Sequence, residues 1–437
     1  MSLVERIRHA GVVGCGGAGF PSQIKASSKA EIVVANGAEC EPLLHKDLEL
    51  MMREPEAIVS GMKLLMEATG ARQGIIGVKK KYEEKLNGMR SALRGSDITL
   101  QYLGDYYPTG DEYVLVYETT HRLIPPQGIP LDVGVVVNNV ETLRNIHRAD
   151  QNHPSFTKYI SVAGAVAHPS TFEVPVGISF ADVIQAAGGA TVDAVAVFVS
   201  GIMMGKLETD LELPVTKTCA GLLVLPMTHR LVQRKILPMA AMHRIGKSAC
   251  DQCSYCTEFC PRYLLGYDVQ PHKVMRSLSF TATGEDIWNQ WAQLCCGCGL
   301  CTLYACPEDL YPKEACDKSK SDLRAKKIAW AGTRDIRIHP MYDGRHVPLK
   351  KLIEKLGISD YDVLAPFEDL KFTPDHVRLP LQQHLGKPAR AIVSAGQRVN
   401  AGDTIADIPE GTLGANIHAS IDGRVKSVTD EIVIERI

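Results

Sequence analysis

Short apolar runs alternate with helical patterns over the first 150 residues of the chain. The apolar runs are strand-like and cover residues 32–35, 75–78, 98–103 and 133–137. A helix is predicted to begin at Pro55, a favourable first-turn residue. Its apolar face is formed by Ile58, Met62, Leu65 and Met66. This alternation predicts an α/β domain with a largely parallel sheet.

The next segment, residues 155–228, has a different pattern. Strand-like runs at 159–163 and 171–174 precede a short helical pattern at 180–187, which Gly188 and Gly189 end. Two further strand-like runs follow at 194–199 and 222–225. Strands grouped around one helix within so few residues predict a small α+β module.

The last 62 residues, 376–437, consist of short β segments separated by turns of glycine and aspartate, such as Gly-Asp at 402–403 and Asp-Gly at 422–423. This pattern resembles the barrel-sandwich fold of lipoyl and biotinyl domains. Those domains carry a lysine at a hairpin tip, whereas the predicted hairpin here, 410–415, has none. We therefore expect a structural or docking module and not a swinging-arm carrier.

Eight cysteines between residues 250 and 306 carry the strongest chemical signal. The first run is Cys-x2-Cys-x2-Cys-x3-Cys-Pro, and the second has one more residue before its last cysteine. In two-cluster ferredoxins the fourth cysteine of each run binds the other cluster. The predicted ligands of cluster 1 are Cys250, Cys253, Cys256 and Cys306, and those of cluster 2 are Cys295, Cys298, Cys301 and Cys260.

Other uses of these cysteines fit the spacing less well. Zinc prefers two separated pairs of ligands, and disulfide frameworks belong to small secreted domains. Within the second run Cys296 competes with Cys295 as a ligand, and spacing favours Cys295 because two residues then precede Cys298. The cysteines outside the two ligand sets are Cys15, Cys40, Cys219, Cys296 and Cys316, which we expect to be free thiols.

Composition is that of an ordinary globular protein of several domains. The chain has 437 residues, 45% hydrophobic and 22% charged, with a net charge of −2. This charge does not indicate a nucleic-acid partner. No apolar run is long enough to span a bilayer, and the N-terminus lacks a secretion signal, so a cytoplasmic location is expected. The Lys-rich stretch at 313–327 predicts a solvated helix face, with an acidic partner as the alternative.

A glycine-dense segment, residues 11–21, lies near the start of the chain. Glycines allow backbone N–H groups to approach a phosphate closely, although a tight turn would use the same residues. Three polar strings, at 36–42, 107–112 and 137–142, stand at the carboxyl ends of predicted strands or in the loops that follow. Open α/β sheets bind ligands at this edge.

Taken together, these strings resemble the flavoprotein subunit of respiratory complex I, the C subunit of the Rnf complex and the cobalamin reductases of propanediol-utilisation microcompartments. The resemblance implies a multidomain α/β and α+β architecture. Its parts are a Rossmann-like FMN/NADH domain (1–150), a β-grasp (SLBB) module (155–228), a ferredoxin-like domain with two [4Fe-4S] clusters (240–330), and a linker with a C-terminal barrel-sandwich hybrid domain (331–437). Domain order and length are most similar to the cobalamin reductases.

The same resemblance implies roles for single residues. Those expected to hold FMN are Gly14, Gly16, Lys25, Asn36, Glu39, Tyr107, Gly110, Asp111, Glu112, Asn138 and Asn139. Phe20 and Glu41 fall where the family meets NADH. Two departures weaken the NADH expectation: Ala38 replaces an acidic residue, and the stretch 123–128 lacks the lysine and phenylalanine of complex I.

The implied activity is electron transfer from NADH to FMN, then to the first cluster, from cluster to cluster, and finally to a corrinoid that is reduced from Co(III) to Co(II) and Co(I). No cobalamin-binding motif is visible in the chain. Expected partners are an adenosyltransferase and a microcompartment shell protein. The alternatives are an Rnf-like input subunit of a membrane complex and a shell-docked electron conduit without NADH activity.

Overall fold

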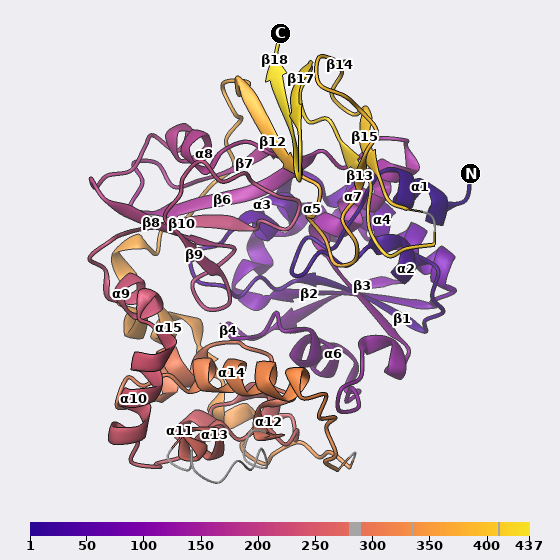
Figure 1. The fold of residues 1–437 in the computed structure, drawn as a ribbon. Coiled ribbons are helices and arrows are strands. Elements are labelled where there is room, and N and C mark those ends of the chain that lie inside the picture. The colour runs from indigo at the N-terminus through magenta and orange to yellow at the C-terminus, as the bar shows by residue number, and fades with distance from the viewer. Residues whose placement is uncertain (279–289, 334, 410) are drawn as a thin grey trace.

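The computed structural model describes residues 1–278, 290–333, 335–409 and 411–437. Its first domain, whose strands β1, β2 and β3 are labelled in Figure 1, is built on a four-stranded parallel sheet in the order β3-β2-β1-β5. The strands are β1 (Ile32–Gly37), β2 (Gln73–Lys79), β3 (Ile98–Leu103) and β5 (Val135–Asn139). All four coincide with predicted apolar runs, so the parallel α/β prediction is confirmed.

Both faces of this sheet are covered, because alternate residues of each strand enter different cores. Val33 and Ala35 pack with Ile58, Met62 and Leu65 of α4 (Pro55–Thr69), the helix predicted from Pro55. Helices α1 (Leu3–His9), α3 (Lys46–Arg53), α5 (Asn87–Ala92) and α7 (Val140–Asp150) contribute to the same side. On the other face, Ile32 and Val34 meet α6 (Glu112–Thr120).

The β-grasp module has a five-stranded mixed sheet in the order β7-β6-β10-β8-β9. Its strands are β6 (Thr157–Gly164), β7 (Ser170–Pro175), β8 (Val195–Val199), β9 (Lys206–Glu208) and β10 (Gly221–Pro226). Helix α8 (Phe180–Ala186) buries Phe180, Val183 and Ile184 against this sheet. The predicted glycines end the helix, since Gly188 and Gly189 both adopt positive φ. The small α+β prediction is therefore confirmed.

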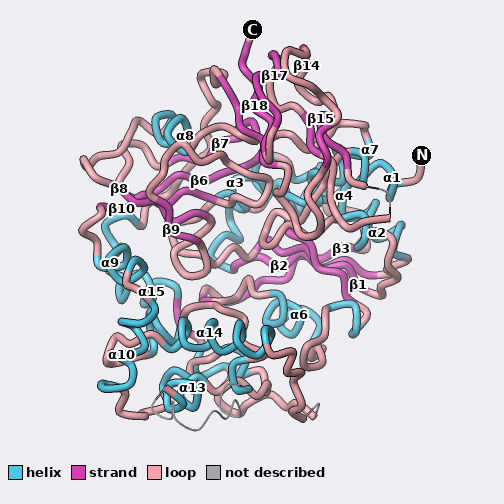
Figure 2. Tube along the Cα trace, in the orientation of Figure 1, coloured by secondary structure: helices cyan, strands magenta, loops and turns pink. Residues whose placement is uncertain are grey.

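The cysteine-rich region is mostly helical and lies at the end of the molecule opposite the C-terminus (Figure 2). Its helices are α9 (Arg230–Ile236), α10 (Met239–Ala249), α11 (Tyr255–Glu258), α12 (Pro261–Leu264), α13 (Pro271–Ser277) and α14 (Pro312–Ala325). The chain then returns to the first domain, where β11 (Val347–Pro348) pairs with β4 (Tyr106–Tyr107) before α15 (Leu349–Leu356).

Two small sheets form the C-terminal module. They contain β12 (His376–Pro380), β14 (Arg398–Val399), β17 (Gly423–Val428) and β18 (Glu431–Arg436), and β13 (Arg390–Ala391), β15 (Thr404–Asp407) and β16 (Ile417–His418). The loop considered for a swinging arm packs against the first domain, because Gln23 Nε2 donates to Gly414 O at 3.0 Å. The structural or docking role of this module stays a prediction; Glu410 itself lies outside the described residues.

No helix in the described part of the chain is both long and apolar enough to cross a membrane.

Candidate functional site

The predicted polar strings meet at the carboxyl edge of the parallel sheet. Asn36 at the end of β1 donates from Nδ2 to Gly110 O at 2.9 Å. On the neighbouring strand β5, Asn139 Nδ2 donates to Asn36 O at 3.4 Å. Asp111 caps α6 by accepting hydrogen bonds from Tyr113 N and Val114 N. Residues separated by about a hundred positions thus form one edge of a site, as expected for a doubly wound sheet.

The glycine-dense loop borders the same edge. A side chain at Gly16 would come within 3.2 Å of Asn139 Cβ, whereas one at Gly17 would meet no atom within 4 Å. Lys25, from the short helix α2 (Ser22–Ala26), donates from Nζ to Val137 O at 2.6 Å. Burial lowers the pKa of Lys25, and the nearby Glu112 carboxylate opposes this shift. Lys25 and Glu112 therefore lie on the same side of the sheet edge.

One polar atom at this edge has no protein partner within the described ranges. Asn138 is 4% exposed, and its Nδ2 makes no hydrogen bond. A buried amide without a partner costs free energy unless a ligand or water satisfies it. Together with the open space at Gly17 and the cation of Lys25, this orphaned donor fits a flavin nucleotide, which offers carbonyl and phosphate acceptors.

A buried charge network supports the floor of the site. Lys46 forms ion pairs with Asp47 and with Glu141, and Glu141 also pairs with Lys158 of the β-grasp module. Asn139 donates to Asp47 Oδ2 at 2.7 Å, which joins the network to the sheet edge. Sequence reasoning missed this network because Lys46 and Lys158 lie in no motif.

Glu39 lies next to the network. Its carboxylate accepts a hydrogen bond from Asp47 N at 3.3 Å. Burial and then the Asp47 charge raise the pKa of Glu39 to about 8, against the opposing effect of Lys46. Glu39 is therefore a carboxyl group that holds a proton at neutral pH beside the sheet edge.

Two other residues with expected ligand roles, Tyr107 and Phe20, make contacts outside the sheet edge itself. The Tyr107 hydroxyl donates to Cys298 O at 2.8 Å, so this side chain faces the second cysteine run. Phe20 lies at the end of the glycine loop, where Gly14 N donates to Phe20 O at 2.9 Å. Its ring centre is 6.0 Å from Lys25 Nζ.

Glu41, expected to meet NADH, is enclosed by the β8–β9 loop. Its carboxylate accepts hydrogen bonds from Met203 N at 3.0 Å and Met204 N at 2.9 Å. Burial raises the pKa of Glu41 to about 7 although these N–H groups oppose the shift. Gly201 makes this approach possible, because any side chain there would come within 2.3 Å of the Glu41 carboxyl carbon. The carboxylate thus faces the β-grasp module.

The first cysteine set lines one cavity, and its members are Cys250, Cys253, Cys256 and Cys306. Burial raises the pKa of Cys256 to about 12, with further contributions first from Cys306 and then from Cys250. Leu310 N donates to Cys306 Sγ at 3.3 Å. Cys253 is exposed, so the cavity borders solvent. An all-cysteine donor set brought together by crossed runs fits an iron–sulfur cluster.

The second set surrounds Cys260. Burial raises the pKa of Cys260, and the sulfurs of Cys296 and Cys295 add to the shift. Burial, Cys295 and Cys256 likewise raise the pKa of Cys301, which places the two cysteine sets side by side. Within the described ranges, no three Cys, His, Asp or Glu side chains stand close enough together to hold a single metal ion.

Two contacts connect this second set to the sheet edge. One is the Tyr107–Cys298 hydrogen bond described above. The other is an ion pair at 3.0 Å between Asp111 and Arg262, which follows Cys260 by two residues. Sequence reasoning did not find Arg262; its place directly after the Cys-Pro end of the first run was the available signal.

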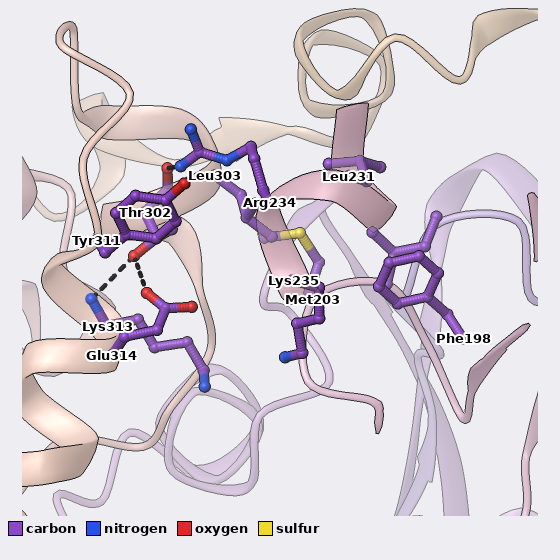
Figure 3. Close-up of a pocket in the computed structure, with 11 residues that line it drawn as sticks. Phe198, Met203, Leu231, Arg234, Lys235, Thr302, Leu303, Tyr311, Lys313 and Glu314 are labelled. Atoms are coloured by element: carbon purple, nitrogen blue, oxygen red, sulfur yellow. Dashed lines mark hydrogen bonds between the residues drawn. The ribbon is translucent and has the colours of Figure 1, made fainter. Parts of the chain in front are cut away.

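A further small cavity lies between the β-grasp module and the cysteine-rich region (Figure 3). Its polar side chains are largely engaged with one another. Arg234 stacks 4.7 Å from the Tyr311 ring centre and donates to Thr302 O, while Thr302 Oγ1 donates to Glu314. These bonds fasten α9 to α14, so the cavity belongs to the contact between modules.

Comparisons with known proteins match several parts of the chain to protein families. Family models match in four places: the Nuo51 FMN-binding domain at residues 7–148, the SLBB domain at 159–206, the 4Fe-4S dicluster domain at 249–311 and the RnfC barrel sandwich hybrid domain at 365–436. The fold and site therefore define an oxidoreductase that transfers electrons through FMN and [4Fe-4S] clusters.

Sequence identity to curated relatives shows which family within this class of oxidoreductases the chain belongs to. The chain is 41% identical over 433 residues to the cobalamin reductase PduS of Citrobacter freundii, covering 99% of this chain and 96% of the relative. It is also 41% identical to PduS of Salmonella typhimurium, with 98% and 95% coverage. One component of the Na⁺-translocating ferredoxin:NAD⁺ oxidoreductase complex of Acetobacterium woodii is 33% identical, with 60% and 58% coverage. The chain belongs to the PduS cobalamin reductase family.

Proposed function

We propose that this protein is an NADH-dependent cobalamin reductase that supplies electrons for recycling of coenzyme B12. One NADH releases two electrons and one proton, and each electron reduces one corrinoid cobalt, from Co(III) to Co(II) or from Co(II) to Co(I). The observation that carries the proposal is the pair of contacts, Tyr107–Cys298 and Asp111–Arg262, that joins the sheet edge to the second cysteine set. The PduS relatives are cobalamin reductases, which supports a corrinoid as the acceptor.

FMN at the sheet edge would supply the change from two-electron to one-electron chemistry, because it accepts a hydride and releases electrons singly. In the proposal, Asn138 Nδ2 and Lys25 Nζ provide the donors, and the glycine loop admits the phosphate. Glu112 is paired electrostatically with Lys25, and burial raises the pKa of Glu112. Glu39 holds a proton within the same edge.

From these contacts we propose the order in which electrons pass through the two clusters. Cys298 and Arg262 contact the flavin domain. By contrast, the cavity of the first cysteine set borders solvent at Cys253. Electrons would therefore enter at the cluster on the second run and leave from the cluster on the first run. This order is the reverse of their order in the sequence.

The proposal also assigns the residue that contacts the nicotinamide. Phe20 stands at the rim of the glycine loop beside Lys25, and we assign it to the nicotinamide side. Glu41 takes part only if the loop containing Met203 and Met204 releases its carboxylate.

The proposed acceptor side is the exposed edge at Cys253, where a corrinoid or a partner holding one would dock. We also propose that this protein is cytoplasmic, that it lies inside a microcompartment or at its shell, and that it works together with an adenosyltransferase. The PduS relatives support this setting by family membership.

Anaerobic stopped-flow mixing of the purified protein with NADH and hydroxocobalamin tests the proposal. Flavin bleaching, cluster bleaching and appearance of Co(II) absorbance should follow one another within a single turnover. A protein that contains flavin and clusters but leaves hydroxocobalamin oxidised would overturn the corrinoid assignment.

The enclosed Glu41 favours one alternative, an electron conduit that does not itself react with NADH. Protein that contains clusters without flavin, and that does not respond to NADH, would select this alternative. An Rnf-like role in a membrane complex, suggested by the RnfC module at 365–436, would instead be supported by co-purification with membrane proteins of that complex.

A further inference from the structure

The two ends of the glycine-dense segment are enclosed by other modules, whereas its middle is open. Gly11 and Gly19, near the two ends, adopt positive φ angles of 63° and 70°. A side chain at Gly11 would come within 2.2 Å of Asn416 O and 2.8 Å of Lys217 Nζ. In the middle, a side chain at Gly17 would meet no atom within 4 Å. Packing therefore requires glycine at the ends, while the middle leaves room for a ligand.

The Gly19 end of the loop meets two modules at once. A side chain at Gly19 would come within 2.8 Å of Thr218 Cγ2 in the β-grasp module and 3.0 Å of His384 Cα in the C-terminal module. Leu385 N, from the same C-terminal loop, donates to Gly19 O at 3.1 Å. The C-terminal module thus docks directly on this end of the glycine-dense segment.

Lys217 of the β-grasp module connects the other end of the segment to the C-terminal module. This side chain is buried, with 4% of the residue exposed. Its Nζ donates to Gly11 O at 2.7 Å and to Asn416 O at 2.9 Å. Its backbone N donates to Gln383 Oε1 at 3.1 Å. A buried amine that donates to carbonyls of two different modules fixes those modules against each other, because each carbonyl would otherwise be buried without this partner.

These contacts hold the segment that admits the flavin phosphate in the proposed function. A glycine-rich segment loses more conformational entropy on ordering than any other sequence. A segment that is already ordered in the free protein does not lose this entropy again when the ligand binds. Fixing the two ends therefore increases the affinity for the phosphate without any contact to it.

We propose that Lys217 is a positioning residue for the flavin phosphate. Together with residues 383–385 and Asn416 of the C-terminal module, it holds the glycine-dense segment at both ends in its ligand-binding conformation. The proposal rests on the FMN site of the proposed function. It also gives the C-terminal module, expected to be structural or docking, a docking target within its own chain.

The test uses the full chain and two ligands that differ only in the phosphate, FMN and riboflavin. Lys217→Met keeps the length of the side chain and removes the donor, and Gly19→Ala introduces the close contacts described above. Two control variants lie in the C-terminal module. Lys387→Met removes an exposed lysine, and Gly396→Ala adds a methyl group at a positive φ of 88° where no atom lies within 4 Å. Flavin is removed from the anaerobic protein, and rebinding is measured by flavin fluorescence.

We expect the wild-type protein to bind FMN more tightly than riboflavin. Lys217→Met and Gly19→Ala should each weaken FMN binding about tenfold, which corresponds to one good hydrogen bond, and leave riboflavin binding unchanged. The two control variants should bind both ligands as the wild type does, and iron content should be the same throughout. In flavin-free protein, amide hydrogen exchange of the glycine-dense segment should be faster in Lys217→Met than in the wild type.

Unchanged FMN binding in Lys217→Met would overturn the inference. Equal weakening of FMN and riboflavin would also overturn it, because the effect would then not act through the phosphate. If Lys217→Met does not fold, Gly19→Ala decides by the same two criteria. Wild-type protein that binds riboflavin as tightly as FMN would overturn the phosphate site itself and the inference with it. Turnover of NADH and hydroxocobalamin tests the proposed electron transfer separately, since none of these binding measurements uses either compound.

Discussion

Arg262 and Asp111 form a nearly dry ion pair between the cysteine-rich region and the flavin-binding domain. The Arg262 Nη1 to Asp111 Oδ1 distance is 3.0 Å, and the two side chains are 8% and 10% exposed. The guanidinium also stacks 3.6 Å from the ring centre of Tyr113. Because Asp111 caps α6 and Arg262 follows Cys260, the pair fixes the second cysteine set against the sheet edge.

Removing one member of this pair should be costly. Arg262→Met leaves Asp111 buried without its partner, and breaking such a pair typically costs about 3 kcal/mol or more. We expect a lower unfolding temperature in anaerobic calorimetry and slower electron exit from the reduced flavin. The double variant Arg262→Met/Asp111→Asn should recover much of the stability, since neither charge is then buried. An exposed pair offers the control: Lys351→Ala, next to Glu354, should change stability by less than about 1 kcal/mol.

Crossed ligation predicts a specific loss in Cys306→Ala. This residue lies at the end of the second run but shares a cavity with Cys250, Cys253 and Cys256. The variant should lose about half of its iron together with the EPR signal of the cluster on the first run. Iron analysis and EPR measure both, and a variant that retains all eight irons would contradict the crossed assignment.

Flavin binding should depend on Glu112 and Asn138. Asn138→Ala removes the unpartnered donor at the sheet edge, and Glu112→Gln removes the charge beside Lys25. Each variant should lower the flavin content several-fold and leave iron unchanged, as measured by flavin release and iron analysis. Asn87→Ala, on an exposed helix start, is the matched control and should keep both cofactors. Equal loss of flavin and iron in Asn138→Ala would indicate misfolding.

Glu39 should make stability depend on pH in a direction opposite to that of a carboxylate whose pKa is lowered in the folded protein. Its pKa is about 8 in the folded protein against an ordinary 4.5, mainly because of burial. Between these values the folded state holds a proton that the unfolded chain lacks, so stability is full below pH 4.5 and falls as the pH rises toward 8. The slope is at most about 1.4 kcal/mol per pH unit.

Glu39→Gln tests this linkage because glutamine stays neutral at every pH. The difference in unfolding temperature between the variant and the wild type should grow from pH 5 to pH 8 in favour of the variant. Parallel curves across this range would mean that Glu39 is ionised in the folded protein.

Local pattern predicted the main strands of the first two modules but not the short strands β4, β9 and β11. The apolar runs of β1, β2 and β5 became largely buried strands, because residues that alternate between two covered faces are mostly apolar, whereas β3 at the sheet edge leaves Thr99 exposed. Pro55 began its helix, and Gly188 and Gly189 ended theirs, since backbone preference acts within a few residues. The Lys-rich stretch formed a helix with its charged face outward and Ala315 and Leu323 inward.

The sequence by itself predicted the two sets of cluster ligands, because the spacing within each cysteine run is a local property. It also located the glycine-dense segment and the polar residues that follow the strands. Only the tertiary structure decided that Glu41 faces Met203, 162 residues away, that Tyr107 meets Cys298, 191 residues away, and that the second run is the one beside the flavin domain. Such contacts depend on how whole modules pack, and no short-range spacing encodes that packing.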